Sequence, residues 1–129
     1  MANTPDVAAW VEKAEEDAQV ASALAALNLQ AYRSSIAFHC QQSAEKYLKA
    51  CLINAGSVFP KTHDFETLLG LCAGIEPGFE SLADAARGLQ PYAVEVRYPY
   101  ATPKESETRE ALVHVETIRS FCRRLLGLA

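Results

Sequence analysis

His63 is a side chain whose type and position could allow it to transfer a proton. It precedes Asp64, where the pattern predicts the start of a helix, and an imidazole near a helix N-terminus can contact a phosphate or exchange a proton. A structural interpretation is favoured over this one: His63 orders the loop, and Asp64 caps the helix. We expect His39, on the preceding predicted helix, to be solvated or to lie at an interface.

A small basic patch is the second candidate for chemistry. Four cations would form it if the end of the second helix and two later loops meet: Lys46, Lys49, Lys61 and Arg97. Such a patch would suit a nucleotide or an RNA phosphate, and Tyr98, in a proline-flanked loop, could stack on a base. In the alternative interpretation these charges are solvated, Glu45 and Lys49 form an i,i+4 pair, and Arg97-Tyr98-Pro99 is a structural stop.

The composition argues against several classes of function. Twelve Lys and Arg against sixteen Asp and Glu give a net charge of -4, so we expect no duplex DNA ligand, and any contact with nucleic acid would be local. The sequence has no glycine-rich phosphate loop, Ser-His-Asp order or metal-ligand spacing, so we expect no cofactor and no metal. No segment has membrane-spanning length, and the four scattered cysteines indicate buried reduced thiols, so we expect a cytoplasmic protein without membrane contact.

The elements that position these residues are all predicted to be helices, because apolar residues recur at intervals of three and four and no segment alternates with a period of two. The predicted helices run from the N-cap Thr4 to about residue 25, from Ser34 or Ser35 to Gly56, from Thr62 or Asp64 to Gly74, from about residue 79 to 96 with a kink at Pro91, and from about residue 106 to 125. We therefore expect a single domain, residues 1–129, that is an all-α antiparallel up-and-down bundle of four long helices plus a short helix.

Asp17 lies beside the apolar stripe of the first predicted helix. A partly buried carboxylate needs a partner, and we expect Arg97 or Arg33 to form a structural ion pair with it.

Three blocks of the sequence, taken in order, resemble the HEPN family of small helical domains that are associated with nucleotidyltransferases. They are residues 37–50 (AFHCQQSAEKYLKA), residues 60–64 (PKTHD) and residues 97–99 (RYP), and the resemblance extends over roughly residues 8–126. It implies a helical bundle that is often homodimeric. Some members of the family pair with a minimal nucleotidyltransferase as the toxin half of a toxin–antitoxin system, and others are metal-independent RNases.

The RNases of this family carry an Arg, four to six intervening residues and then a His. Such a pair suits cleavage by the RNA 2'-hydroxyl, because His can act as base or acid near neutrality and Arg can hold the phosphate. No His follows Arg97 at this distance, whereas Arg109 and His114 match the spacing. Residues five apart on a regular helix differ by roughly 140° in direction, so this pair would converge only at a helix start or across two subunits.

Two classes of function therefore remain. The favoured one is a HEPN-like binding or partner module, with a nucleotide, RNA or a nucleotidyltransferase as its partner and with a homodimer as its assembly. The alternative is a metal-independent endoribonuclease toxin of a toxin–antitoxin system, with Arg109 and His114, or Arg97 and His63, as the active pair. Convergence of either pair would favour the enzyme.

Overall fold

The computed structural model describes residues 4–94 and 101–128 of the chain. Its helices are α1 (Pro5–Asn28), α2 (Arg33–Asn54), α3 (Phe65–Ile75), η1 (Pro77–Leu82), α4 (Ala83–Leu89), η2 (Gln90–Tyr92) and α5 (Glu105–Leu125), where η denotes a 3₁₀ helix. No strand occurs within the described residues. The predicted all-α bundle is confirmed.

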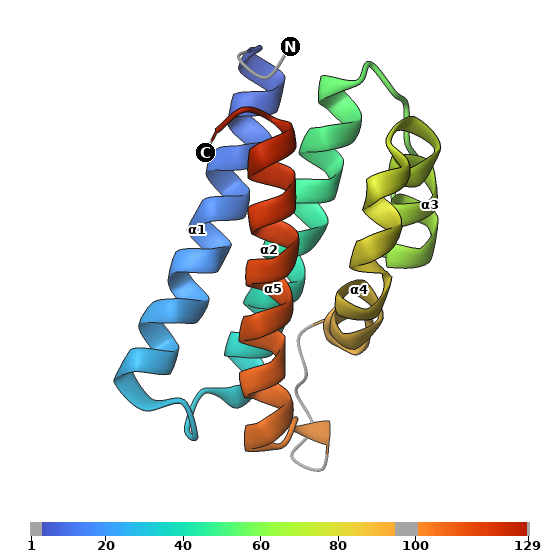
Figure 1. Cartoon of the computed structure of the whole chain (residues 1–129). Helices are drawn as coiled ribbons and strands as arrows, with labels where there is room; N and C mark the ends of the chain where they lie inside the picture. Colours follow the sequence, from blue (N-terminus) through green and yellow to red (C-terminus); the bar gives the residue numbers. More distant parts are fainter. Residues whose placement is uncertain (1–3, 95–100, 129) are drawn as a thin grey trace.

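Helix α2 forms the centre of the bundle. It packs against α1, α5, α3 and α4, and Figure 1 shows the long helices α1, α2 and α5 side by side, with α3 and α4 as a shorter pair beside them. Because α2 has neighbours on several sides, its side chains are buried around most of its circumference. Tyr47, Leu48 and Leu52 are all fully buried.

The predicted helix ends are confirmed where a capping residue defines them. Thr4 caps α1 by accepting a hydrogen bond from the Val7 amide at 3.4 Å. Gly56, just after α2, has a φ of 72°, the left-handed conformation that glycine adopts readily. Asp64 caps α3, because its carboxylate accepts hydrogen bonds from the backbone amides of Glu66 and Thr67.

The fourth predicted helix differs from its prediction. It begins as the 3₁₀ helix η1, continues as the seven-residue α4, and ends in the short η2, which contains Pro91. Proline has no backbone N–H and crowds the preceding turn, so the α-helical pattern does not continue through this position. Val94 lies beyond η2 and outside any helix, and residues 95–96 of the prediction lie outside the described residues.

The four cysteines are free and buried, as predicted. Burial raises the pKa of Cys40 to about 12, and it raises the pKa of Cys72 to about 12 with a smaller contribution from Cys51. Thiols of this kind are protonated at neutral pH and are poor nucleophiles. Among the described residues, no helix combines the length and the apolar character that would let it cross a membrane.

Candidate functional site

His63 lies in the loop before α3, and its ring is held by a carboxylate of α2. Its Nδ1 atom is 2.9 Å from Oε1 and 3.0 Å from Oε2 of Glu45. The Glu45 side chain is 4% exposed, whereas that of His63 is 62% exposed. The buried carboxylate therefore binds the imidazole through Nδ1, and the other ring nitrogen, Nε2, remains available to a ligand.

Glu45 is the centre of a buried polar network on α2. Its carboxylate accepts hydrogen bonds from Gln41 Nε2 at 3.0 Å and from Lys49 Nζ at 3.0 Å. The Lys49 ammonium also lies 5.7 Å from the centre of the Trp10 ring and 5.8 Å from that of Phe59, within the range of cation–π attraction. Lys49 is thus the i,i+4 partner of Glu45 rather than a free cation for a ligand.

A second carboxylate holds Lys46. Asp17 of α1, whose side chain is 10% exposed, lies 2.5 Å from Lys46 Nζ and 2.8 Å from His39 Nδ1. The expected partner Arg33 instead donates from Nε to the backbone carbonyl of Pro103 at 2.9 Å. The prediction of an Asp17–Arg33 pair is therefore wrong, because α1 packs along α2 and places Asp17 beside residues in the middle of α2. The other expected partner, Arg97, lies outside the described residues.

Of the remaining members of the predicted patch, the structure describes only Lys61. Lys61 is exposed and has no hydrogen-bond or ion-pair partner among the described residues. Arg97 and Tyr98 lie outside the described residues. Two of the four cations, Lys46 and Lys49, are therefore neutralised by carboxylates within the fold.

Arg109 and His114 lie on α5 and do not converge within one chain. Arg109 is exposed and pairs with Glu105 one turn earlier, at 3.5 Å. His114 is half-buried and packs against α4, so closely that a Cβ atom on Gly88 would lie 2.6 Å from its Cδ2 and Nε2 atoms. Each side chain thus has a structural neighbour of its own. Among the described residues, no group of three His, Cys, Asp or Glu side chains is arranged to hold a metal ion.

Comparison with known proteins assigns the chain to a family. The sequence model of the HEPN domain matches residues 7–125. The chain belongs to the HEPN domain family. Its fold is similar to that of the crystal structure of TT1696 from Thermus thermophilus, with a TM-score of 0.74 and 26% sequence identity over 94% of this chain and 98% of that one. No curated protein matches the chain.

This HEPN domain contains a further polar cluster that joins three helices. Glu15 of α1 accepts hydrogen bonds from Arg119 Nε of α5 at 2.7 Å, from Arg123 Nη1 of α5 at 3.3 Å and from the Tyr47 hydroxyl of α2. The Arg123 Nη1 atom also lies 3.2 Å from the Tyr47 oxygen. Burial, followed by the interaction with Glu15, raises the pKa of Tyr47 to about 12, so its hydroxyl remains protonated and donates.

No local pattern in the sequence indicated this cluster, because more than a hundred residues separate Glu15 from Arg119. Arg119 and Arg123 lie near the C-terminal end of α5, where cations also suit the helix dipole. In the structure, both guanidinium groups donate hydrogen bonds to the Glu15 carboxylate.

Replacing Glu15 by glutamine should destabilise the HEPN domain at neutral pH by about 1–2 kcal/mol, because charge-assisted hydrogen bonds are lost. Burial alone would raise the pKa of Glu15, but the hydrogen bonds from Arg119 and Tyr47 and the charges of Arg119 and Arg123 hold it below its usual value of 4.5. A carboxyl whose pKa falls on folding stabilises the fold above its unfolded pKa, and this contribution is lost as the pH falls through the folded pKa.

Urea unfolding of the wild type and of Glu15→Gln checks this expectation. The difference in unfolding free energy between the wild type and Glu15→Gln should have its full size at pH 7 and should shrink progressively below pH 4.5. A difference that stays constant down to strongly acidic pH would show that the charge of Glu15 does not stabilise the fold.

Proposed function

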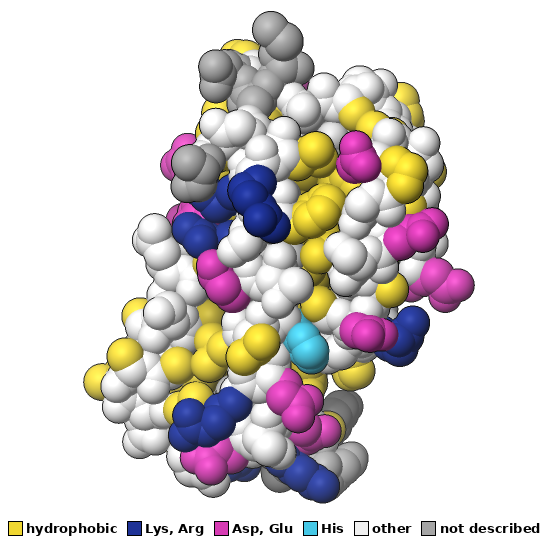
Figure 2. Space-filling model, in the orientation of Figure 1, with side chains coloured by type: hydrophobic (Ala, Val, Ile, Leu, Met, Phe, Trp, Pro, Cys, Tyr) yellow, Lys and Arg dark blue, Asp and Glu magenta, His cyan; other side chains and the backbone are white. Residues whose placement is uncertain are grey.

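We propose that this HEPN domain is a partner module that works as a homodimer, with α1 and α5 as the dimer face. The observation that carries the proposal is a band of small and aliphatic side chains where these two helices lie next to each other (Figure 2). The band lines two hollows of about 460 and 450 Å³ and includes Ala18, Ser22 and Ala25 of α1 and Leu112, Val113 and Val115 of α5. Glu116 lines both hollows, and Glu15 and Arg119 line one of them. Val113 is 64% exposed.

The extent of the α1–α5 face suits a dimer. With 24 and 21 residues, the two helices are about 30–36 Å long and together about 20 Å wide, which gives roughly 600 Å² of face. A standard protein interface buries about 800 Å² per partner, so this face and a modest rim would suffice. The small side chains of α1 allow a second helix to approach closely, and an isologous dimer would pair this face with itself.

Replacing Val113 by glutamate should weaken the dimer at least about tenfold, because each subunit would add a second carboxylate beside Glu116 and remove an aliphatic contact from the face. The matched control is Val58→Glu, at a valine that is 91% exposed in the loop after α2. Sedimentation velocity over a concentration series measures both variants against the wild type. Equal dissociation constants for Val113→Glu and Val58→Glu would refute α1–α5 as the dimer face.

The ligands and partners that suit this module are a nucleotide, an RNA segment or a nucleotidyltransferase. The exposed Lys61, with Arg97 and Tyr98 of the same predicted patch, is the proposed contact for a phosphate and a base. We place the module in the cytoplasm, because its four cysteines are all free thiols and such proteins are typical of reducing compartments. Pairing with a nucleotidyltransferase would make it one half of a toxin–antitoxin system.

A second candidate function is a metal-independent endoribonuclease, and the environment of His63 favours it. An exposed imidazole held by a buried carboxylate resembles the general acid or base of a hydrolytic site. Gln90 accepts a hydrogen bond from the Phe65 amide at 2.7 Å and donates to the His63 carbonyl at 3.4 Å. The segment that leads to Arg97 therefore begins beside His63, so this pair can be proposed within one chain. The pair Arg109 and His114 would require a second subunit.

Cleavage of a mixed-sequence RNA in the presence of a metal chelator tests this second function. His39→Ala is the matched control for His63→Ala, because both rings bind a buried carboxylate through Nδ1. Cleavage that is lost in His63→Ala and Arg97→Ala but retained in His39→Ala would support the enzyme. Absence of cleavage by the folded wild type would exclude free-standing activity under these conditions.

A further inference from the structure

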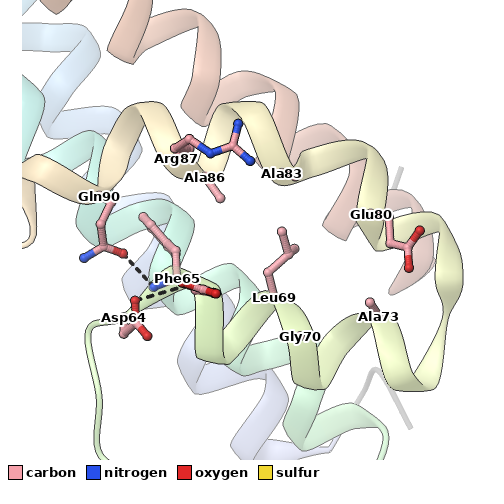
Figure 3. Close-up of a pocket in the computed structure, with 11 residues that line it drawn as sticks. Asp64, Phe65, Leu69, Gly70, Ala73, Glu80, Ala83, Ala86, Arg87 and Gln90 are labelled. Atoms are coloured by element: carbon pink, nitrogen blue, oxygen red, sulfur yellow. Dashed lines mark hydrogen bonds between the residues drawn. The ribbon is translucent and has the colours of Figure 1, made fainter.

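A groove of about 490 Å³ runs between α3 and the η1–α4 segment. Figure 3 shows that these two elements lie next to each other, with Asp64 and Gln90 at one end of the groove and Glu80 at the other. The floor is formed by apolar and small residues: Phe65, Leu69, Gly70, Ala73, Ala83 and Ala86. The groove is therefore a shallow apolar channel with room for a few aliphatic side chains.

The rim of the groove is acidic. Asp64, Glu66 and Glu80 line it, and the one cation, Arg87, pairs with Asp84 at 2.8 Å. Residues 64–90 contain five Asp and Glu and one Arg, a net charge of -4, which equals the net charge of the whole chain. The rest of the sequence is thus electrically balanced, and the negative charge of the protein is concentrated on the helices that form the groove. This potential attracts a cationic partner and repels nucleic acid.

Gly70 leaves the α3 wall of the groove without a side chain. It lies in the middle of α3, and a Cβ atom at this position would meet nothing within 4 Å. Glycine inside a helix costs about 0.5–1 kcal/mol relative to alanine. The missing side chain leaves room over α3 for groups of a partner, whereas the equally open Gly74 does not line the groove.

We propose that the groove docks a basic, amphipathic helical segment of a partner protein. Aliphatic side chains of the segment enter the channel over Leu69, Gly70 and Ala86, and its lysines or arginines pair with the rim carboxylates Glu66 and Glu80. Helix-in-groove recognition of this kind derives affinity from apolar burial and selectivity from charge. The inference deepens the proposed partner-module function by naming the chemistry of the partner, and it does not depend on the α1–α5 dimer face.

Fluorescence anisotropy with two labelled synthetic helices tests the proposal on the full chain. One helix carries leucines four residues apart with lysines on both flanks, and its twin carries glutamate at every lysine position. The lysine helix should bind at least about tenfold more tightly than its twin, and its affinity should fall as salt is added. Equal binding of the two helices, or no binding of the lysine helix, would overturn the proposal.

Two pairs of variants locate the binding. Gly70→Leu should abolish binding of the lysine helix because it fills the channel, while Gly74→Leu, on the same helix and with equally open surroundings, should retain it. Glu80→Lys should weaken binding at least about fivefold, while Glu12→Lys on α1 should not. Wild-type affinity in Gly70→Leu would contradict the groove as the site. The same titration on Val113→Glu separates this proposal from the dimer, since groove binding should survive loss of the dimer.

Discussion

Replacing Glu45 by leucine should destabilise the HEPN domain by about 3–5 kcal/mol, the typical cost of leaving one member of a buried ion pair without its partner. The side chains of Glu45 and Lys49 are 4% and 9% exposed. Without the carboxylate, the Lys49 ammonium would remain beside the rings of Trp10 and Phe59 with no counter-charge. Gln41 would also lose the acceptor of its side-chain hydrogen bond.

Urea unfolding of the single variants and of the double variant Glu45→Leu, Lys49→Met measures this pair. The double variant should recover most of the lost stability, because it removes both charges and leaves apolar groups of similar size. If it is no more stable than Glu45→Leu alone, the loss comes from packing and not from the unpaired ammonium. Circular dichroism at 222 nm confirms that each variant is folded before the comparison is made.

Replacing Gly88 by alanine should destabilise the fold by about 1–3 kcal/mol, the usual cost of overpacking. The added Cβ atom would lie 2.6 Å from Cδ2 and Nε2 of His114. Either the imidazole must rotate away or α4 must move relative to α5. The contact bears on function, because it makes His114 a packed side chain rather than a free acid or base.

The double variant Gly88→Ala, His114→Ala is the control for this contact. Once the ring is removed, the new methyl group has space, so Gly88→Ala should cost little in the His114→Ala background. Thermal unfolding followed by circular dichroism gives the four stabilities of the cycle. Equal costs of Gly88→Ala in both backgrounds would contradict a direct contact between Gly88 and His114.

The helices could be predicted from the sequence because the signals that define them are local. Helix ends are set by hydrogen bonds or backbone conformation within a few residues, as at Thr4, Gly56 and Asp64. The spacing of apolar residues along a helix can be recognised without knowing which other helices pack against it. The division of the fourth helix into η1 and α4 was not predicted. Both elements pack against α3, and α4 also packs against α5, so their contacts involve segments that are distant in the sequence.

The side-chain networks were predicted only where they are local. The Glu45–Lys49 pair lies within one turn of α2 and was foreseen as an alternative. The contacts of Asp17 with Lys46 and of Glu15 with Arg119 join different helices, so the spacing within one helix carries no information about them. Two members of the expected basic patch, Lys46 and Lys49, thus form ion pairs, since the sequence does not specify which carboxylate faces which cation.

The mass of the wild-type protein in solution tests the central claim, a homodimeric partner module, most directly. Light scattering coupled to size-exclusion chromatography, run over a series of loading concentrations, distinguishes one chain of 14.1 kDa from a pair. We expect twice the chain mass at micromolar concentration, with a shift toward the single-chain mass on dilution. A mass of one chain at every concentration would contradict the α1–α5 dimer.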